Sequence, residues 1–596
     1  MPFADSHAEK QQLPPPTGSS SRPEASDSSS SGPSATSHGY SSSRRPSSVG
    51  SVEGIAQYDG HRPSEEELTR CRSRRLSASQ VSAHSTGFEG VGLVPWFSGE
   101  SIISRIRSRP PVPPFHHPLA GCPTTDDYLV DFDGPDDPYR PVNWPPRKKA
   151  TTTLLYGLVT MTATWASSAY SSGTHLVAAE FDVSHEVAVL GTTLFLLGFG
   201  LGPLLWAPLS EVYGRRVAVL TPMAIAVCFS FATATAKDLQ TILLTRFFGA
   251  VFSSAPVTNT GGVLGDLYTP AHRGYAMAGY ALAVVGGPTL GPIASSAVAQ
   301  DPSLGWRWTE YITGILQAFV LAVTVLLVDE TYPPSLLVRK ARQLRITTGN
   351  WALHARFEEW DVTPAELARK FLIRPLQLLA TPICALIALY TSFTYGVMYM
   401  QLGAVPIIFA QRRGWGLGVR GSLPFLAQFL GAVTGLGINA VNQVGYNRAL
   451  KARGERVLPE RRLPPMMLGS VLLAGGQFMM GWTAEPEAAP WIVPVIGLYL
   501  SGCGFNTVFQ AGLNYLVDTF HLYAASAVAA NTFLRSCFAA AFPLAVGPLY
   551  NNLGVGPGAS IFGGFACLLI PVPFVFYAYG KRIRAASHWS KGSCLG

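Results

Sequence analysis

Two arginines of this sequence, Arg246 and Arg535, lie inside apolar stretches long enough to cross a membrane. A charged side chain at that depth costs ~2.5–3.5 kcal/mol on insertion scales unless it is paired or hydrated. Each arginine therefore indicates an internal polar cavity. For Arg246 the alternative is that its long side chain extends to the outer membrane interface.

Carboxylates that bind and release protons would have to lie at the ends of the apolar stretches, because the centres of these stretches contain no Asp or Glu. Partial burial at such an end can raise the pKa of a carboxyl group toward the working pH. The chemistry these residues support is therefore reversible protonation and ion pairing. We take Arg246, Glu310 and Arg535 as candidates for proton coupling. The acids near segment ends are Glu180, Glu211, Asp266, Glu310 and Asp518.

Other chemistries lack their sequence motifs. The chain contains no HExxH metal box, no GxSxG nucleophile turn and no GxxxxGK[ST] phosphate loop. Gly198-x-Gly200-x-Gly202 lies inside an apolar segment, where a dinucleotide loop cannot form. We therefore expect neither an enzyme nor an ATP-driven pump, and no cofactor or metal. Five of the eight cysteines stand singly in apolar segments without metal-ligand spacing: Cys228, Cys384, Cys503, Cys537 and Cys567.

Long apolar segments make up most of the chain after residue 130. Hydrophobic residues are 48% and charged residues only 13% of the 596, whereas soluble domains carry about 25% charged residues. A spanning helix needs ~20 apolar residues to cross ~30 Å of hydrocarbon. We therefore predict an all-α membrane protein with twelve transmembrane helices in two six-helix bundles. The segments lie near 151–171, 187–207, 217–236, 240–263, 275–299, 308–329, 376–400, 421–441, 464–483, 490–513, 524–547 and 559–579.

The parts outside the bundles are polar. The first 128 residues are rich in Ser and Pro and cannot bury enough apolar surface to offset chain entropy, and they begin without a signal-peptide core. Two Arg-Arg-x-Ser stretches, at 44–47 and 74–77, are either kinase sites or chance matches in a Ser-rich tail. The predicted domains are a disordered cytoplasmic tail (1–128), a pre-helix segment (129–150), an N-terminal bundle (151–329), a basic middle loop (330–375), a C-terminal bundle (376–580) and a C-terminal tail (581–596).

The orientation in the membrane follows from the loops that carry Lys and Arg, because cytoplasmic loops retain positive charge. One side receives Arg147 to Lys149, the middle loop and the basic stretches 448–462 and 581–584. Both termini are therefore predicted to be cytoplasmic. The formal charge of +8 has the same origin, so we exclude nucleic acid as a partner. The other side receives Lys237, Arg307, Arg412, Arg413 and Arg420, of which the residues after the seventh segment are discordant.

The two halves also repeat each other faintly. Glu211-x-x-Gly214 after the second segment resembles Asn442-x-x-Gly445 after the eighth, and the fourth and tenth segments end in similar strings around Asp266 and Asp518. Matches of this kind indicate parallel structural repeats, as in transporters that rock one bundle against the other. Chance similarity between short strings is the alternative.

Residues 200–216 place an acid and two arginines in one tight turn, ending Ser-Glu-Val-Tyr-Gly-Arg-Arg. This stretch resembles the signature loop of the major facilitator superfamily, in the form typical of its fungal drug:proton antiporter family with twelve spans. It departs from the superfamily pattern at Ala207 and Val212. The resemblance covers most of residues 130–585. Further matching strings are Asp133-Gly-Pro-Asp-Asp-Pro138, Gly305-Trp-Arg-Trp308, Glu330-Thr-Tyr-Pro-Pro334 and Asn531-Thr-Phe-Leu-Arg535.

The resemblance implies a cytoplasmic gate. In that family the loop's acid and arginines form a charge relay with the acid that ends helix 4. Arg246 corresponds to the basic residue of the family's helix 4 motif, and our hypothesis is that it tunes the proton site. Ion pairs at half-hydrated positions form and break at modest cost. The alternative is that the two loop arginines only set topology. The implied gate residues are Glu211, Gly214, Arg215, Arg216, Asp266 and, through the repeat, Asp518.

Gly287-x-x-x-Gly291-Pro292 resembles the antiporter motif of the same superfamily. Small residues four apart let two helices approach closely, and proline removes a backbone hydrogen bond. We therefore predict a tightly packed hinge at the interface between the halves, with generic helix packing as the alternative. Ser295 and Ser296 stand where the motif continues with glycines.

Substrate contacts should come from polar and aromatic side chains that face a cavity. The resemblance implies a monomer that exchanges cationic or amphipathic drugs, polyamines or toxins for protons at the plasma membrane or, alternatively, the vacuolar membrane. An uptake symporter and a non-transporting nutrient receptor of the same fold are the rival hypotheses. The candidate substrate residues are Asn259, Tyr395, Tyr399, Phe505, Asn506, Gln510 and Asn531.

Overall fold

The computed structural model describes residues 128–359, 369–452, 459–520 and 523–586. These ranges consist of helices and connecting loops without a strand, apart from a single bridge between Leu129 and His354. The predicted disordered tail lies outside the described residues except for Tyr128. The two Arg-Arg-x-Ser stretches and the predicted C-terminal tail from residue 587 lie outside them as well.

The first half of the described chain builds six long helical segments. One of them is interrupted at Ser254, between α7 and α8, and a short helix, α4 (Thr174–Glu180), joins the first two. The six segments are α3 (Pro146–Ala169), α5 (His185–Tyr213), α6 (Arg215–Ala234), α7 with α8 (Leu239–Ser253 and Ala255–Leu267), α9 (Pro270–Ala299) and α10 (Arg307–Leu327).

The second half of the described chain builds six more. Between the halves lie α11 (Pro333–Thr348) and α13 (Arg374–Leu379). The six segments are α14 (Pro382–Val405), α15 with α16 (Val419–Ser422 and Pro424–Ala452), α17 (Pro464–Trp482), α18 (Ile492–Thr519), α19 (Ala524–Leu553) and α20 with α21 (Val555–Leu569 and Pro571–Ala586).

Ten of the described helices are long and apolar enough to cross a membrane. The helices α3 and α17 complete six spans in each half, since they pack along α9 and α18. The predicted all-α, twelve-span fold is thus confirmed. Several helices continue past the apolar stretch that marks them, and the segment predicted to end near residue 441 belongs to a helix that runs to Ala452. Hydropathy locates the lipid-facing part, whereas backbone hydrogen bonding carries the helix beyond it.

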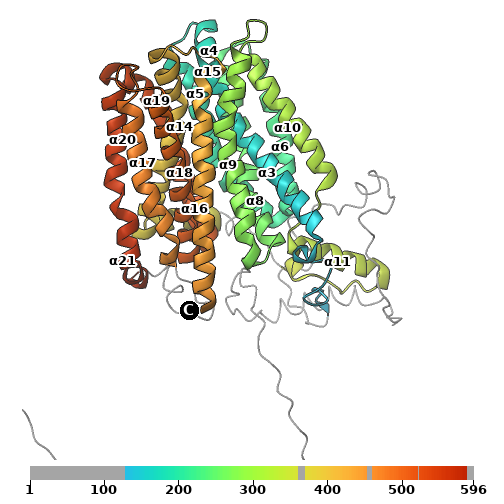
Figure 1. Cartoon of the computed structure of the whole chain (residues 1–596). Coiled ribbons are helices and arrows are strands. Elements are labelled where there is room, and N and C mark those ends of the chain that lie inside the picture. The colour runs from blue at the N-terminus through green and yellow to red at the C-terminus, as the bar shows by residue number, and fades with distance from the viewer. Residues whose placement is uncertain (1–127, 360–368, 453–458, 521–522, 587–596) are drawn as a thin grey trace, which may run out of the picture. The chain divides into compact units, whose positions relative to one another are not determined.

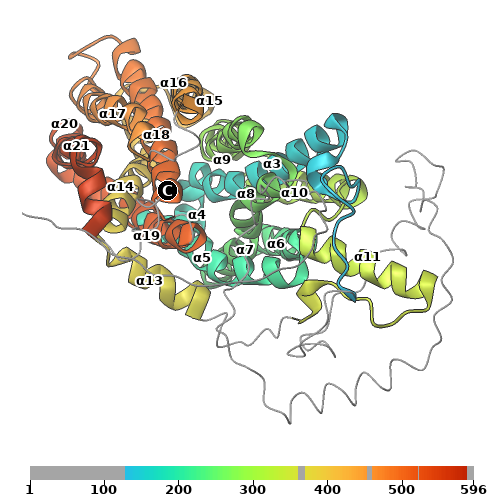
Figure 2. The ribbon, with the colours of Figure 1, turned by 90° about the horizontal axis from the view of Figure 1, so that it is seen from below.

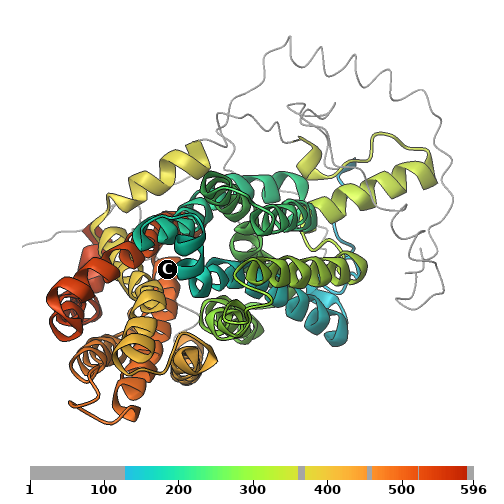
Figure 3. The same cartoon turned by 90° about the horizontal axis from the view of Figure 1, so that it is seen from above.

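The helices of the two halves form two groups that meet along two pairs. Helices α3 to α10 lie together, and α14 to α21 lie together, in the views from below and above (Figures 2 and 3). Contact between the groups runs mainly along α9 with α16 and along α5 with α19. In Figure 1 the end of the helices beside α11 is at the bottom and the end that carries α4 and α15 is at the top. We call these the α11 face and the α4 face.

Local sequence signals explain where the helices of the first half begin and end. The hydroxyl of Ser184 accepts a hydrogen bond from the N–H of Val187 at the start of α5, and the Asp238 carboxylate accepts one from Thr241 at the start of α7. Such caps satisfy N–H groups that have no partner within the helix. Between α5 and α6 the chain turns at Gly214 with φ 90°, a backbone conformation that favours glycine.

The discordant arginines on the α4 face have local partners. Arg413 donates hydrogen bonds to the backbone carbonyls of Thr483, Ala484, Glu485 and Ala489. These bonds tie the end of the seventh span to the loop after α17. The positive charge at this position therefore has a structural role, which accounts for its departure from the positive-inside pattern.

Candidate functional site

The interior of the first half contains an ion pair between Arg246 on α7 and Glu310 on α10. The guanidinium Nη1 lies 2.8 Å from the carboxylate Oε1, and the two side chains are 1% and 3% exposed. The two residues are 64 positions apart in sequence. Of the described residues, Arg246 is the one that hydrogen-bonds Glu310. The structure thus brings together two of the three residues that the sequence nominated for proton coupling.

Two further helices hold the guanidinium in place. Arg246 donates to the carbonyl of Ala166 on α3 at 3.1 Å and to that of Gly191 on α5 at 3.2 Å. Its charge also lies over the rings of Tyr170 and Phe195, 4.5 and 4.6 Å from their centroids, where the π electrons attract a cation. Four helices therefore meet at this one side chain.

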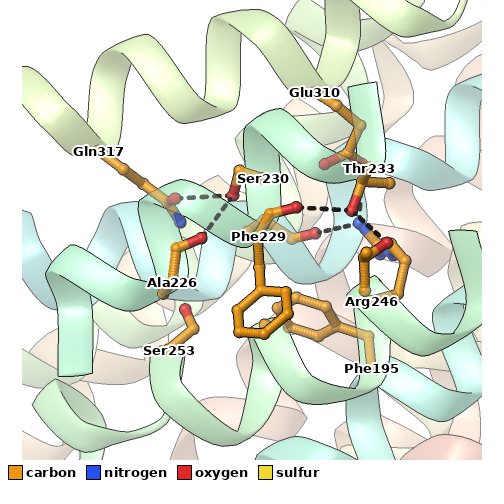
Figure 4. Close-up of a pocket in the computed structure, with 12 residues that line it drawn as sticks. Phe195, Ala226, Phe229, Ser230, Thr233, Arg246, Ser253, Glu310 and Gln317 are labelled. Atoms are coloured by element: carbon orange, nitrogen blue, oxygen red, sulfur yellow. Dashed lines mark hydrogen bonds and ion pairs between the residues drawn. The ribbon is translucent and has the colours of Figure 1, made fainter. Parts of the chain in front are cut away.

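A small polar cavity of about 10 Å³ adjoins the ion pair (Figure 4). Its polar wall includes Ser230, which donates to Gln317 at 2.9 Å, and Thr233, which bonds Thr245 at 2.9 Å. That volume is close to the least that one water molecule occupies. The site is thus small and partly polar, and a proton entering it would need water or these hydroxyl groups as a path.

Two of the predicted gate residues of the first half, Arg215 and Asp266, form an ion pair on the α11 face. Arg215 lies 3.3 Å from Asp266 at the end of α8 and donates to the Ser210 hydroxyl at 2.8 Å. Its guanidinium also stacks on Tyr332, 4.9 Å from the ring centre. Arg216 instead donates to the carbonyl of Val325. The signature loop therefore connects α5, α6, α8 and the end of α10.

The carboxylate at the centre of this network was not predicted from the sequence. Glu330, just after α10, accepts hydrogen bonds from the backbone N–H groups of Arg215 and Arg216 at 2.9 and 3.0 Å. A carboxylate at a helix N-terminus pairs with unsatisfied N–H groups and with the positive end of the helix dipole. A side chain on Gly214 would collide with Glu330, since a Cβ there would lie 2.6 Å from its Oε2. The only signal was its place in a string that resembles the family.

Asp518 belongs to a separate network in the second half. It lies 2.8 Å from Arg462, which precedes α17, and accepts from the Tyr446 hydroxyl at 3.0 Å. Arg462 stands before the ninth span as Arg215 stands at the start of the third, and each pairs with the acid that ends the following span. This matches the predicted repeat, although Arg462 itself had not been singled out. The two halves touch nearby, where Gly274 of α9 faces Gln443 of α16.

The predicted hinge glycines do not lie between the halves. A Cβ on Gly287 would lie 2.1 Å from the Thr164 hydroxyl, and one on Gly291 would lie 2.4 Å from that of Ser168, both on α3. Pro292 contributes its carbonyl to a hydrogen bond from Ser172. For the two glycines the predicted neighbour was wrong, because the spacing identifies a close-packed helix face but not the helix it packs against, whereas Pro292 lines a cavity to which both halves contribute. Here the small residues join α9 to α3 within the first half.

Three of the predicted substrate residues form an aromatic cluster around Arg535. The ring of Tyr395 lies 5.2 Å from that of Tyr399 and 5.9 Å from that of Phe505. The Arg535 guanidinium lies 4.5 Å from the Tyr395 centroid and 5.2 Å from that of Phe509, which was not predicted. We call Tyr395, Tyr399, Phe505, Phe509 and Arg535 the aromatic cluster.

The remaining candidates are placed elsewhere. Asn259 donates to the Trp206 carbonyl within the first half, and Asn531 accepts from Thr391 at 2.6 Å within the second. The backbone carbonyl of Asn506 accepts from Asn439 at 3.3 Å. The Oε1 atom of Gln510 is buried without a hydrogen bond. Asn259, Asn506 and Asn531 thus join helices within one half.

A cavity of about 310 Å³ lies between the halves on the α4 face. Both halves line it, with Ser171 and Thr192 on one side and Leu402 and Pro543 on the other. One helical turn deeper, the Tyr399 hydroxyl and the Ser167 hydroxyl are 2.8 Å apart and buried. This hydrogen bond between α14 and α3 joins the two halves next to the cavity.

The sequence pattern of the Major Facilitator Superfamily matches residues 154–543. The chain belongs to this superfamily. An efflux pump, bik6, of Gibberella fujikuroi is 47% identical over 78% of the chain and 95% of its own length. The multidrug transporter FLU1 of Candida albicans is 36% identical over 90% of the chain and 87% of its length. The xylose transporter XylE from E. coli, 15% identical, shares the fold with a TM-score of 0.52 over 73% of this chain and 98% of its own.

Proposed function

We propose that this chain is a proton-coupled exporter of small organic molecules that works by alternating access, with Arg246 and Glu310 as its proton site. Membership of a transporter superfamily and the similarity to an efflux pump and a multidrug transporter support export. The buried ion pair is the observation that carries the proton coupling.

The pair links protonation to helix position. Helix α5 holds the Arg246 guanidinium through the Gly191 carbonyl, whereas Glu310 sits on α10. A shift of α5 would draw the guanidinium away from the carboxylate. An unpaired buried carboxylate is strongly disfavoured, and binding a proton neutralises it. Glu310 thus takes up a proton in one arrangement of α5 and releases it in the other.

The same helix connects the pair to the other half. Thr193, two residues after Gly191, donates to the carbonyl of Ala540 on α19 at 3.0 Å. A Cβ on Gly200 of α5 would lie 2.5 Å from the Cβ of Ser536. Rocking of the halves displaces α5 at these contacts. Substrate movement between the halves and proton movement at Glu310 therefore share one mechanical element.

We assign the α11 face to the cytoplasm, because basic residues concentrate in its loops, and we place the chain in the plasma membrane as a monomer. On that face Glu211, Arg215, Arg216 and Asp266 act as a gate with Glu330, and Asp518 acts with Arg462. The predicted domain boundaries, including the cytoplasmic tail 1–128 and the middle loop 330–375, form part of this proposal.

The test begins with efflux from cells that overexpress the chain, using a panel of basic, neutral and acidic cytotoxic compounds. An exported compound is then followed in proteoliposomes under an imposed proton gradient. We expect Glu310→Gln to abolish gradient-driven accumulation and to retain exchange of labelled for unlabelled substrate, which needs no net proton movement.

The matched control is Glu180→Gln. Glu180 also pairs with an arginine, Arg307 at 2.7 Å, but its side chain is 40% exposed on the α4 face. We expect this variant to accumulate substrate as the wild type does. Gradient-driven transport that survives Glu310→Gln would exclude the proposed proton site, and accumulation in the direction of proton flow would indicate an uptake symporter instead.

A further inference from the structure

Arg535, near the middle of α19, is a buried cation without an acidic partner in the described part of the chain. It is 5% exposed, and its Nε is buried without a hydrogen bond. Among the described residues its guanidinium has no hydrogen bond or ion pair, and it lies over the rings of Tyr395 and Phe509. Aromatic faces attract a guanidinium but do not neutralise it. The side chain thus retains its full capacity to bind an anion.

Arg246 provides the comparison within the same molecule. It is equally buried, at 2% exposed, and it also lies over two aromatic rings. Unlike Arg535, it has a carboxylate at 2.8 Å and two backbone carbonyls as partners. Buried charges in proteins are normally paired in this way. The difference between the two arginines therefore needs a cause outside the protein's own side chains.

The surroundings of Arg535 come from both halves. The next residue, Ser536, faces Gly200 of α5 in the other half. Tyr280 of α9 and Tyr399 of α14 lie within electrostatic range of the guanidinium. Arg535 therefore lies where the two halves meet, with tyrosines from both halves around it.

The α4-face cavity lies near this position. Pro543 lines the cavity and lies on the same helix as Arg535, eight residues away, or about 12 Å along the axis at ~1.5 Å per residue. The hydrogen bond between Tyr399 and Ser167 stands between them. It joins the two halves, so their separation would break it and connect the cavity with the aromatic cluster.

The charges around the cavity disfavour a cation. Glu186, at the rim, is the one acid among the described residues that line the cavity, where His175 and His185 are also found. Glu310 is engaged by Arg246. A cation moving inward would be repelled by the unpaired guanidinium of Arg535, with no acid nearby to offset the repulsion. An anion would gain this guanidinium as its counter-charge.

We propose that the cargo is an organic anion, an aromatic or amphipathic molecule whose carboxylate or ionised phenol pairs with Arg535 while its rings pack on Tyr395, Phe505 and Phe509. The inference rests on the proposed export function and narrows the substrate class. A guanidinium presents several N–H donors in a plane that matches a carboxylate. The stacked rings of Phe505 and Phe509, 5.7 Å apart, provide a flat apolar wall beside that charge.

The experiment uses three probes that share one ring system and differ in charge: 2-naphthalenesulfonate, 2-naphthalenesulfonamide and trimethyl-2-naphthylammonium. Binding to the purified full chain is measured by thermal stabilisation and by calorimetry. We expect the wild type to bind the anion at least about tenfold more tightly than the neutral or cationic probe, since a hydrogen bond to a charged group contributes ~1.5–3 kcal/mol.

The variants isolate Arg535. Arg535→Gln should lose the tenfold preference for the anion and still bind the neutral amide, which shows that the site has folded. Arg535→Lys should keep the order of the three probes. The control Arg412→Gln removes the same charge from an exposed pair with Glu485 and should behave as wild type.

A wild type that favours the ammonium probe, or an Arg535→Gln variant that keeps the sulfonate preference, would overturn the assignment. If chloride stabilises the wild type and the sulfonate does not compete with it, the site binds an inorganic ion only. That result would also overturn the assignment. If Arg535→Gln does not fold, the assignment is tested by the order of affinity for the three probes in the wild type and in Arg535→Lys. Gradient-driven transport that survives Glu310→Gln, together with an intact anion preference, would refute the proposed mechanism but not this inference.

Discussion

Replacing Glu310 by leucine should destabilise the chain more than any change at an exposed ion pair. The Arg246 side chain is 1% exposed and that of Glu310 3%, so water does not screen the charge left behind. Removing one partner of a buried pair costs about 3–5 kcal/mol. Arginine cannot lose its proton at accessible pH, and the guanidinium of Glu310→Leu therefore stays charged.

Replacing the partner, Arg246, by methionine should lower the free energy of unfolding by less. In Arg246→Met the carboxyl group of Glu310 can bind a proton and become neutral, which limits the penalty. In the double variant, Arg246→Met with Glu310→Leu, no buried charge is left. Buried pairs replaced by apolar side chains of similar volume are often neutral in stability. We expect the double variant to be more stable than Glu310→Leu by about 2 kcal/mol or more.

The free energy of unfolding is measured by denaturant titration in detergent micelles, followed by tryptophan fluorescence. Glu180→Leu serves as the reference, because its partner Arg307 is 34% exposed and such a pair contributes about 0–1 kcal/mol. If the two single costs simply add in the double variant, or if Glu310→Leu costs no more than Glu180→Leu, the two charges are not coupled and the proposed proton site loses its physical basis.

Three further substitutions test the close packing of α9 and two ion pairs outside the proton site. Gly287→Ala should lower the melting temperature through an overpacking cost of about 1–3 kcal/mol, whereas Gly279→Ala on the same helix, with open space at its Cβ, should not. Burial alone would raise the pKa of Asp137, but backbone N–H groups and the Lys340 ammonium, 3.0 Å away, outweigh it and hold this pKa below its usual value. Its contribution to stability is therefore present above about pH 4 and lost as the pH falls further, and Asp137→Asn should flatten that part of a melting curve against pH. Asp518→Asn should slow transport, measured as the rate of substrate movement in proteoliposomes, and leave probe binding at Arg535 unchanged. An unchanged transport rate would show that Asp518 is not part of the gate.

Much of the candidate site is visible in the sequence because its signals are local. Arg246 and Arg535 stand out as charges within apolar segments, and the turn at Gly214 with its two arginines is contiguous. Asp266 and Asp518 could be matched because each ends a span in a similar string. These features depend on neighbours within a few residues, where spacing translates directly into position on a helix.

The missed contacts join residues far apart in the chain. Glu330 caps α6 across 115 residues, and its role is invisible until the end of α10 is placed beside the start of α6. The hinge glycines illustrate the same limit, since the small-residue spacing was correct but the helix that fills it is α3. The rotation of each helix about its axis, which packing alone decides, determines these partners.

By itself the sequence determined the twelve spans, the division into halves and the charged turn after the second span, because hydropathy and local spacing are properties of short segments. Only the tertiary structure decided that Arg246 has a carboxylate beside it and Arg535 has aromatic rings. The two arginines look alike in sequence. Their difference arises from which side chains of distant helices are brought against each of them, and that depends on how all the helices pack together.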